Sequence, residues 1–272
     1  MKTKEILVVN DDGVHSPGLL VLKRKIEKLG NVFVVTPETE RSGTGKAVST
    51  SLIEVKKTSL ADGTKAYAIG GTPADACLLA IFKILRHPPD LVVSGINLGP
   101  NLGIDDLLTS GTIGAALEAA IHGVPAIAVS YSLKRIKSRE EKTQVNINVE
   151  SLEFCAELAK ETADYIFRNG MPKDVDLISI NVPETVASKT VEVTSLSYKG
   201  YTDIFAEKTG GYQLRGWFLE DYPRDLSGTD IHAIREDGHA SITPIKLNLT
   251  HEKRNLKGLT EFLNGKGYDA GL

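Results

Sequence analysis

The sequence predicts an α/β fold: a Rossmann-like, doubly wound and mostly parallel sheet with a C-terminal β-hairpin and helix elaboration. In the first half, short apolar runs typical of strands covered on both faces alternate with amphipathic helical patterns. The C-terminal part changes to Thr-, Tyr- and Gly-rich stretches. We expect a single domain over residues 1–272, with a core at about 1–185. The elaboration, at about 186–272, is expected to serve subunit contact in an oligomer.

The first predicted unit is a strand, a helix and a second strand. The first strand covers residues 5–10. Ser16 and Pro17 then open a helix, as a polar cap followed by proline, and Gly30 ends it. The second strand covers residues 32–35.

The next helix has strong start signals. Thr72 is the cap, Pro73 occupies the first position and Asp75 places an acid in the first turn. Two extended pieces precede it, at about 51–57 and 65–69.

The later elements are expected in this order: strand 91–93, helix 111–122, strand 125–129, helix 151–168, strand 177–182, strands and hairpins over 190–218, helix 231–236, strand 239–245 and helix 255–263.

Composition excludes several classes of function. The formal net charge of −3 gives no basic surface for a nucleic acid polymer. About 18 consecutive apolar residues would be needed to span a membrane, and no such run occurs. No apolar signal region precedes the first strand, and Cys77 and Cys155 fall in apolar helical patterns. We therefore expect a cytoplasmic protein with two core thiols. Separately, the mixed charge run at 134–145 is expected to be a solvated loop.

Asp11 and Asp12 lie side by side where the first strand ends. Adjacent carboxylates repel each other and are unfavourable to desolvate, which indicates a cation between them. A hard divalent cation prefers such oxygen ligands. The alternative is a solvated acidic turn, since Asp, Asn and Gly also form turns.

A second loop, residues 41–46, follows the second strand. Ser42 can join a metal shell, and Gly43 lets the backbone approach a ligand closely. Lys46 is followed by Ala47, so the loop is not a Walker phosphate loop. The alternative is a flexible surface loop.

A third, long loop is expected over residues 94–112. Ser110, Gly111 and Thr112 would offer hydroxyls and N–H groups to a phosphate at the positive end of a helix. The amides of Asn97 and Asn101 could bind a metal or an anion. Long loops in compact domains are usually functional, although an ordinary N-cap is the alternative.

Together these loops suit metal-assisted phosphomonoester hydrolysis. A receiver-like Mg-binding phospho-signalling module is the main alternative, but it needs a phosphate-accepting aspartate where Ser94 and Gly95 stand. A dinucleotide-dependent oxidoreductase needs a glycine-rich turn after the first strand, where this chain has two acidic residues instead. A haloacid-dehalogenase-type phosphatase needs two aspartates separated by one residue, whereas Asp11 and Asp12 are adjacent. His15 is a candidate proton donor beside the acidic pair.

Several motifs resemble those of the SurE family, the stationary-phase survival proteins, which are metal-dependent nucleotidases. The motifs that carry the resemblance are Val9-Asn10-Asp11-Asp12-Gly13 with Pro17-Gly18, Arg41-Ser42-Gly43-Thr44-Gly45, Gly71-Thr72-Pro73-Ala74-Asp75, Ser94-Gly95-Ile96-Asn97 through Asn101, Ser110-Gly111-Thr112-Ile113-Gly114-Ala115-Ala116, Ile180-Asn181-Val182-Pro183, Thr229-Asp230 and Ser241-Ile242-Thr243-Pro244-Ile245. They extend to about residue 245. The chain departs from the pattern at 107–109, where an aromatic is common, and the stretch 197–225 is hard to align. Base preference is therefore not predicted.

The resemblance implies a nucleotidase that hydrolyses nucleoside 5′- and 3′-monophosphates, and also short polyphosphate. It implies one divalent ion, Mg²⁺ or Mn²⁺, and a homodimer or homotetramer built through C-terminal hairpins and exchanged segments. The implied metal ligands are Asp11, Asp12, Ser42 and Asn97. The implied substrate-binding residues are Gly43, Asn101, Ser110, Gly111 and Thr112. Catalysis is assigned to Asp11, Asp12 and Asn101, with Asp11 favoured over Asp12 as the carboxylate that activates water.

Overall fold

The structure is a computed structural model that describes residues 3–133, 147–186, 189–214, 219, 222–250 and 256–267. The charged run at 134–145 lies outside the described residues. Among the residues described, no helix has the length and apolar character needed to cross a membrane.

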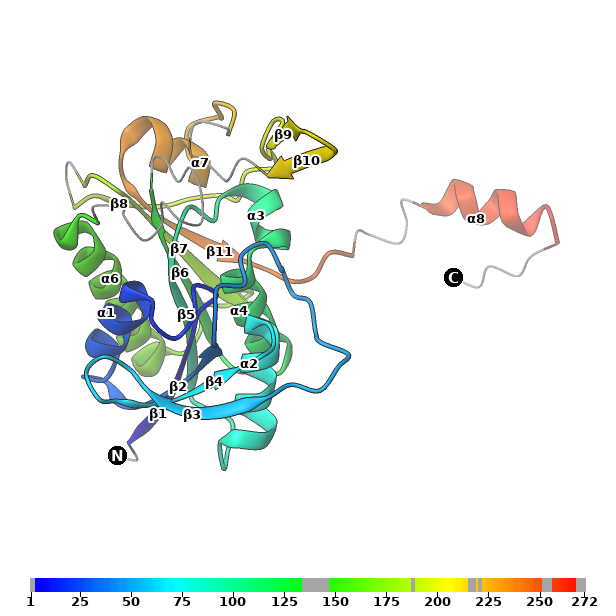
Figure 1. Cartoon of the computed structure of the whole chain (residues 1–272). Helices are drawn as coiled ribbons and strands as arrows, with labels where there is room; N and C mark the ends of the chain where they lie inside the picture. The colour runs from blue at the N-terminus through cyan, green and yellow to red at the C-terminus, as the bar shows by residue number, and fades with distance from the viewer. Residues whose placement is uncertain are drawn as a thin grey trace.

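Within the described residues, nine strands form one mixed, mostly parallel sheet in the order β3-β4-β2-β1-β5-β6-β7-β11-β8 (Figure 1). The antiparallel pairs are β3 with β4 and β11 with β7. The strands of the sheet are β1 (Lys4–Val9), β2 (Gly30–Pro37), β3 (Val55–Ser59), β4 (Lys65–Ile69), β5 (Leu91–Leu98), β6 (Ala126–Ser132), β7 (Leu177–Pro183), β8 (Val191–Val193) and β11 (Ala240–Ile245). A separate hairpin joins β9 (Phe205–Lys208) to β10 (Gly211–Leu214). The predicted α/β fold with a mostly parallel sheet is therefore confirmed.

Helices cover both faces of this sheet, and β1 shows why. Ile6 and Val8 face one core, and Leu7 and Val9 face the other, since successive strand side chains point to opposite faces. The helices over the first face are α1 (Pro17–Ile26) and α6 (Val149–Asn169). Those over the second are α2 (Pro73–Leu79), its π-helical continuation η1 (Ala80–Ile84) and α4 (Gly111–Ile121). Cys155 is buried in the first core and Cys77 in the second, as expected of core thiols.

The start of α2 confirms its sequence signals. The Thr72 hydroxyl accepts a hydrogen bond from the Asp75 N–H at 3.1 Å, and the Asp75 carboxylate accepts one from the Thr72 N–H at 2.8 Å. This reciprocal capping box satisfies two N–H groups that the helix leaves unpaired.

The predicted end of α1 was wrong. The helix ends at Ile26, and Gly30 is instead the first residue of β2, paired with Lys4. A Cβ at Gly30 would lie 2.3 Å from the Lys4 carbonyl oxygen, so glycine is needed there for close strand approach rather than for helix termination.

The prediction of one long loop over residues 94–112 was also wrong. Strand β5 continues to Leu98, and residues Gly103–Thr109 form helix α3. Beyond its predicted end the strand pairs with β6 again at Asn97 and Leu98, after a register shift that follows Ser94. Gly95 has a φ of +137°, and a Cβ there would lie 2.3 Å from the Val129 carbonyl oxygen, so only glycine fits this step.

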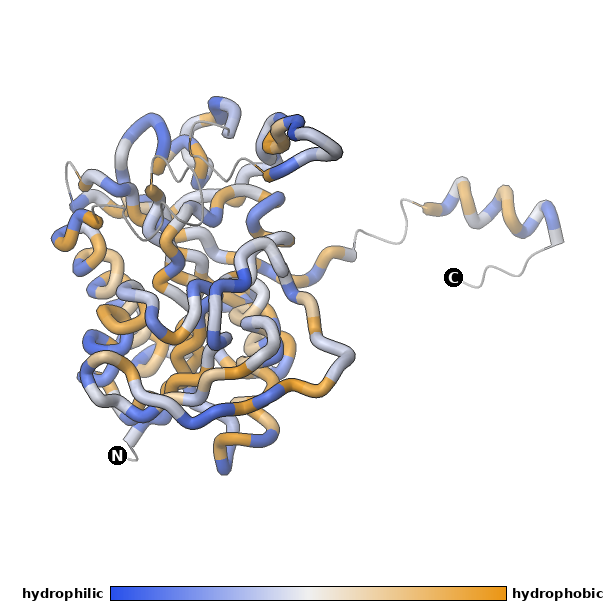
Figure 2. Tube along the Cα trace, in the orientation of Figure 1, coloured by the Kyte–Doolittle hydropathy of each residue, from blue (hydrophilic) through white to orange (hydrophobic). Residues whose placement is uncertain are grey.

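The C-terminal part contains short elements. They are α7 (Asp230–His232), η3 (Ala233–Asp237), strand β11 and α8 (Lys257–Asn264), besides β8 and the hairpin. Figure 1 shows α8 lying away from the sheet and its helices. Apolar and polar residues alternate along it (Figure 2), and none of its residues is buried. Leu259 and Phe262 are 52% and 62% exposed, so the described part of the chain leaves the apolar stripe of α8 largely uncovered.

Candidate active site

The carboxyl ends of β1 and β5 define the candidate site. In the sheet β1 lies between β2, which follows it in the chain, and β5, which comes later, so the strand order reverses between β1 and β5. Such a reversal opens a crevice beyond the strand ends, because the helices that follow the two strands cover opposite faces. Asp11 and Asp12 follow β1 directly, and Asn97 lies near the end of β5.

Asp11 connects the first loop to the start of helix α4. Its side chain is 3% exposed, and the Thr112 hydroxyl donates to its Oδ1 at 2.5 Å. The Arg41 N–H donates to its backbone carbonyl at 2.7 Å. A Cβ at Gly111 would lie 3.0 Å from Asp11 Cβ and 3.1 Å from the Thr44 hydroxyl. The three predicted loops therefore meet around Asp11.

Asp12 connects the first loop to β5. Its Oδ2 accepts a hydrogen bond from the Leu98 N–H at 3.0 Å, so the carboxylate is held beside Asn97. The Asn97 Nδ2 donates to the Gly99 carbonyl at 2.9 Å. This bond sets the direction of the amide and leaves its oxygen, the atom suited to a cation, on the opposite side of the group.

Ser42 and Gly43 lie on the second loop, one and two residues after the Arg41 contact with Asp11. Ser42 is partly buried and its hydroxyl donates to Glu40 Oε1 at 2.6 Å, while Gly43 is exposed. The loop is fixed from the other side, since the Gly45 N–H donates to the Thr109 carbonyl at 2.8 Å. Glu40 adds a third carboxylate to this edge, and sequence reasoning missed it because nothing in its local pattern points to the loop contact.

Ser110 caps helix α4 and is 7% exposed. Its oxygen accepts a hydrogen bond from the Ile113 N–H at 3.2 Å, which uses a lone pair and leaves the hydroxyl proton able to serve a ligand. Together with Gly111 and Thr112 it forms the N-terminus of an eleven-residue helix whose partial positive charge lies beside Asp11.

Asn101 lies farther along the sheet than the two aspartates. Its Nδ2 donates to the Ser130 hydroxyl of β6 at 2.7 Å. Its backbone N–H donates to Asn181 Oδ1 at 3.0 Å, and Asn181 Nδ2 donates back to its carbonyl at 2.9 Å. These contacts fix Asn101 over the ends of β6 and β7. Ser130 and Asn181 are supporting residues. Asn181 belongs to one of the family motifs but was given no role from the sequence, and Ser130 was not singled out. His15 is exposed on the turn between β1 and α1.

The residues at this edge fit a hard divalent cation. Asp11, Asp12, Ser42 and Asn97 supply carboxylate, hydroxyl and amide oxygens, which Mg²⁺ and Mn²⁺ prefer. Gly111 has only a hydrogen where a Cβ would press on Asp11. Within the described residues, the buried Nε of Arg41 has no hydrogen-bond partner, although its Nη2 donates to the Gly70 carbonyl at 3.1 Å. An unsatisfied buried donor beside the loop that carries Ser42 is consistent with an anionic ligand.

Helix α3, which directly precedes α4, contains a buried carboxylate that the sequence analysis did not single out. Asp106 is 4% exposed, accepts the Leu102 N–H at 2.8 Å and contacts the hydroxyls of Tyr201 and Tyr222. Burial raises the pKa of Asp106 to about 7, although both tyrosine hydroxyls act to lower it. Burial also raises the pKa of Tyr222 well above its ordinary value. The Ser110 N–H donates to the Asp106 carbonyl at 2.9 Å, so this cluster supports the start of α4.

Comparison with known proteins identifies the relatives of this chain. The family described as Survival protein SurE matches residues 6–203. The chain belongs to the SurE family. A 5'-nucleotidase SurE from Methanobrevibacter smithii is 37% identical over 254 residues, which cover 92% of this chain and 97% of the relative. One from Methanosarcina barkeri is 40% identical over 250 residues, covering 90% and 93%.

A solved structure agrees with this assignment. The crystal structure of the SurE protein from Aquifex aeolicus superposes with a TM-score of 0.72 at 30% identity, covering 96% of this chain and 99% of that one. The chain therefore has the SurE fold, and the resemblance read from its motifs is confirmed at the level of the family.

Proposed function

We propose that this SurE-family chain is a metal-dependent phosphomonoesterase that hydrolyses nucleoside 5'- and 3'-monophosphates, and also short polyphosphate. The chain is an enzyme, a phosphomonoester hydrolase of the SurE family. The observation that carries the finer proposal is the 2.5 Å contact between Thr112 and Asp11, which joins a candidate metal ligand to a helix N-terminus suited to a phosphate. The relatives from Methanobrevibacter smithii and Methanosarcina barkeri carry the name 5'-nucleotidase.

In this proposal Asp11, Asp12, Ser42 and Asn97 hold one Mg²⁺ or Mn²⁺. Bound there, the ion would polarise a phosphate oxygen and lower the pKa of a bound water. Asp11 is the favoured residue to orient the attacking water, since its carboxylate is fixed by Thr112 and Asp11 is only 3% exposed.

The phosphate faces the start of α4 in this arrangement. The Ser110 hydroxyl and the N–H groups of Gly111 and Thr112 stabilise negative charge as it develops on the phosphoryl oxygens, because the helix dipole points its positive end at them. Asn101 positions the substrate from the β6 side, and the exposed backbone of Gly43 closes the opposite side.

Family membership favours hydrolysis over the receiver-like signalling alternative. A receiver needs an aspartate at the end of the strand next to β1, and in β5 the residue paired with Val9 is the buried Ser94. That hydroxyl cannot replace a phosphate-accepting carboxylate.

The test is hydrolysis of p-nitrophenyl phosphate and of a panel of nucleoside monophosphates. Activity should disappear with EDTA and return with Mn²⁺ or Mg²⁺. Asp11→Asn should lower kcat by at least about 100-fold while the circular dichroism spectrum is retained, because a neutral amide cannot attract the cation as a carboxylate does. Asp174→Asn, a change at an exposed residue paired with Lys246, is the matched control and should retain activity. Full activity after exhaustive chelation would refute the proposal.

We also propose that residues 1–272 act as one domain and that its C-terminal elements join copies of the chain into a homodimer or homotetramer. The support is the apolar stripe of α8, which is exposed in the single chain and lies away from the sheet (Figure 1). Leu259 and Phe262 would be covered if α8 docked on a second copy, since exposed apolar stripes on helices generally mark contact surfaces.

A further inference from the structure

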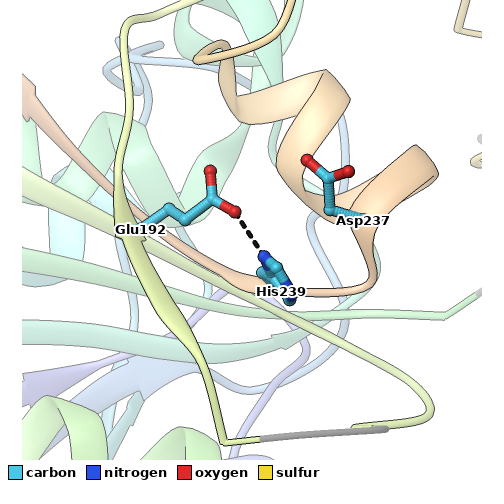
Figure 3. A group of neighbouring side chains, drawn as sticks. All are labelled: Glu192, Asp237 and His239. Carbon is cyan, nitrogen blue, oxygen red and sulfur yellow. Dashed lines mark hydrogen bonds and ion pairs between the residues drawn. The ribbon is translucent and has the colours of Figure 1, made fainter.

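A second cluster of potential metal ligands lies at the edge of the sheet formed by β8 and β11. The ligand atoms of Glu192, Asp237 and His239 all lie within 4.8 Å of one another. Figure 3 shows the three side chains coming from three segments, with both carboxylates on the same side of the imidazole ring. None of them belongs to the candidate active site. Four strand spacings separate β11 from β1, which is roughly 20 Å at the usual distance between neighbouring strands.

The backbone brings these three residues together. Glu192 is the central residue of the edge strand β8, and it pairs with Ser241 of β11. The Ala240 N–H donates to the Thr190 carbonyl at 3.0 Å, which holds the start of β11 beside β8. Gly238 separates the other two ligands and has a φ of +66°, a left-handed turn that ends η3.

Among the described residues, no lysine or arginine balances the negative charge of the cluster. Within the described part of the chain, Glu192 forms its ion pair with His239, and Asp237 forms its ion pair with His232 at 3.4 Å. In the part of the chain that the structure describes, neither carboxylate forms an ion pair with a lysine or an arginine. A histidine carries a balancing positive charge only when it is protonated. Two carboxylates with a neutral imidazole attract a divalent cation.

We propose that Glu192, Asp237 and His239 bind a divalent ion of the zinc type, distinct from the hard ion of the candidate active site. An imidazole nitrogen favours Zn²⁺, Co²⁺ or Ni²⁺ over Mg²⁺ and Ca²⁺, which prefer oxygen ligands throughout. A tetrahedral zinc site with ligands at about 2.1 Å holds its donor atoms about 3.4 Å apart, so small side-chain rotations suffice. The three side chains are 30–35% exposed, which gives the ion access from solvent.

His232 supports one of the ligands. Its Nδ1 lies 3.0 Å from the Asp225 carbonyl and its Nε2 lies 3.4 Å from Asp237 Oδ2. A histidine that contacts a ligating carboxylate in this way fixes the orientation of that carboxylate. The bound ion joins the edge strand β8 to the η3–β11 junction, and therefore stabilises the C-terminal half of the molecule.

The experiment measures Zn²⁺ bound per chain by equilibrium dialysis and elemental analysis of the full-length protein. The double variant Glu192→Gln/His239→Gln should bind one Zn²⁺ fewer than the wild-type protein, and its Tm should rise less on addition of Zn²⁺. The matched control is Glu54→Gln/His87→Gln, at exposed positions, which should bind the wild-type number. Equal numbers in all three proteins would overturn the proposal.

A second variant separates metal binding from the loss of the Glu192–His239 ion pair. Asp237→Asn keeps that pair and removes one ligand, so Zn²⁺ affinity at this site should fall at least about tenfold while the Tm in EDTA stays close to that of the wild-type protein. An unchanged affinity would show that Zn²⁺ is not held by Asp237 and would overturn the proposed ligand set.

Discussion

The buried carboxylate of Asp106 makes the stability of this protein depend on pH. Burial raises its pKa from 3.8 to about 7. At 1.36 kcal/mol per pKa unit, this rise corresponds to a penalty of about 4 kcal/mol for the ionised form in the folded state. Asp106→Asn removes the ionisable group and keeps its shape, including an oxygen that can accept the Leu102 N–H.

The sign follows from proton binding. The folded protein binds a proton at Asp106 more tightly than the unfolded chain does, so this group's contribution is fully present below about pH 4. It is lost as the pH rises through about 7. Between pH 5 and pH 8 the wild-type free energy of unfolding should therefore fall by about 2–3 kcal/mol relative to Asp106→Asn.

Urea unfolding at several pH values, at one matched protein concentration, measures this difference. Asp174→Asn is the control, since that residue is exposed and its substitution should leave the wild-type pH dependence unchanged. If the difference between the wild-type protein and Asp106→Asn is the same at pH 5 and at pH 8, the assignment of a raised pKa to Asp106 is wrong.

Three other predictions follow from the structure. Thr112→Val should raise the inhibition constant for inorganic phosphate about tenfold, because it removes the hydrogen bond that joins the helix end to the Asp11 carboxylate. Thr112→Ser keeps a hydroxyl and should stay close to wild type. Equal inhibition of Thr112→Val and the wild-type protein would contradict the role of the helix end. Gly111→Ala should lower kcat at least about tenfold, since the added Cβ would press on Asp11. Gly258→Ala is the control, because a Cβ at Gly258 would meet no atom within 4 Å. Equal kcat values for Gly111→Ala and the wild-type protein would contradict the close packing of Gly111 on Asp11. Phe262→Asp should lower the mass measured by light scattering if α8 joins two copies, and an unchanged mass would place the interface elsewhere.

Local signals in the sequence determined most elements of the fold. The capping box at Thr72 and the start of α4 at Ser110 depend on residues within one helical turn, so they can be recognised without the tertiary structure. The apolar run before Asp11 predicted β1 for the same reason. The motifs also identified the family, because their order along the chain is specific even where each one alone is weak.

Only the tertiary structure decided which polar groups meet. Thr112 and Asp11 are 101 residues apart in the chain, and nothing local to either predicts their contact. The extension of β5 past Ser94 depends on its pairing with β6, and the burial of Asp106 depends on tyrosines nearly a hundred or more residues later. Contacts of this kind arise from how the strands and helices pack, and the amino-acid pattern around one residue carries no record of its distant neighbours.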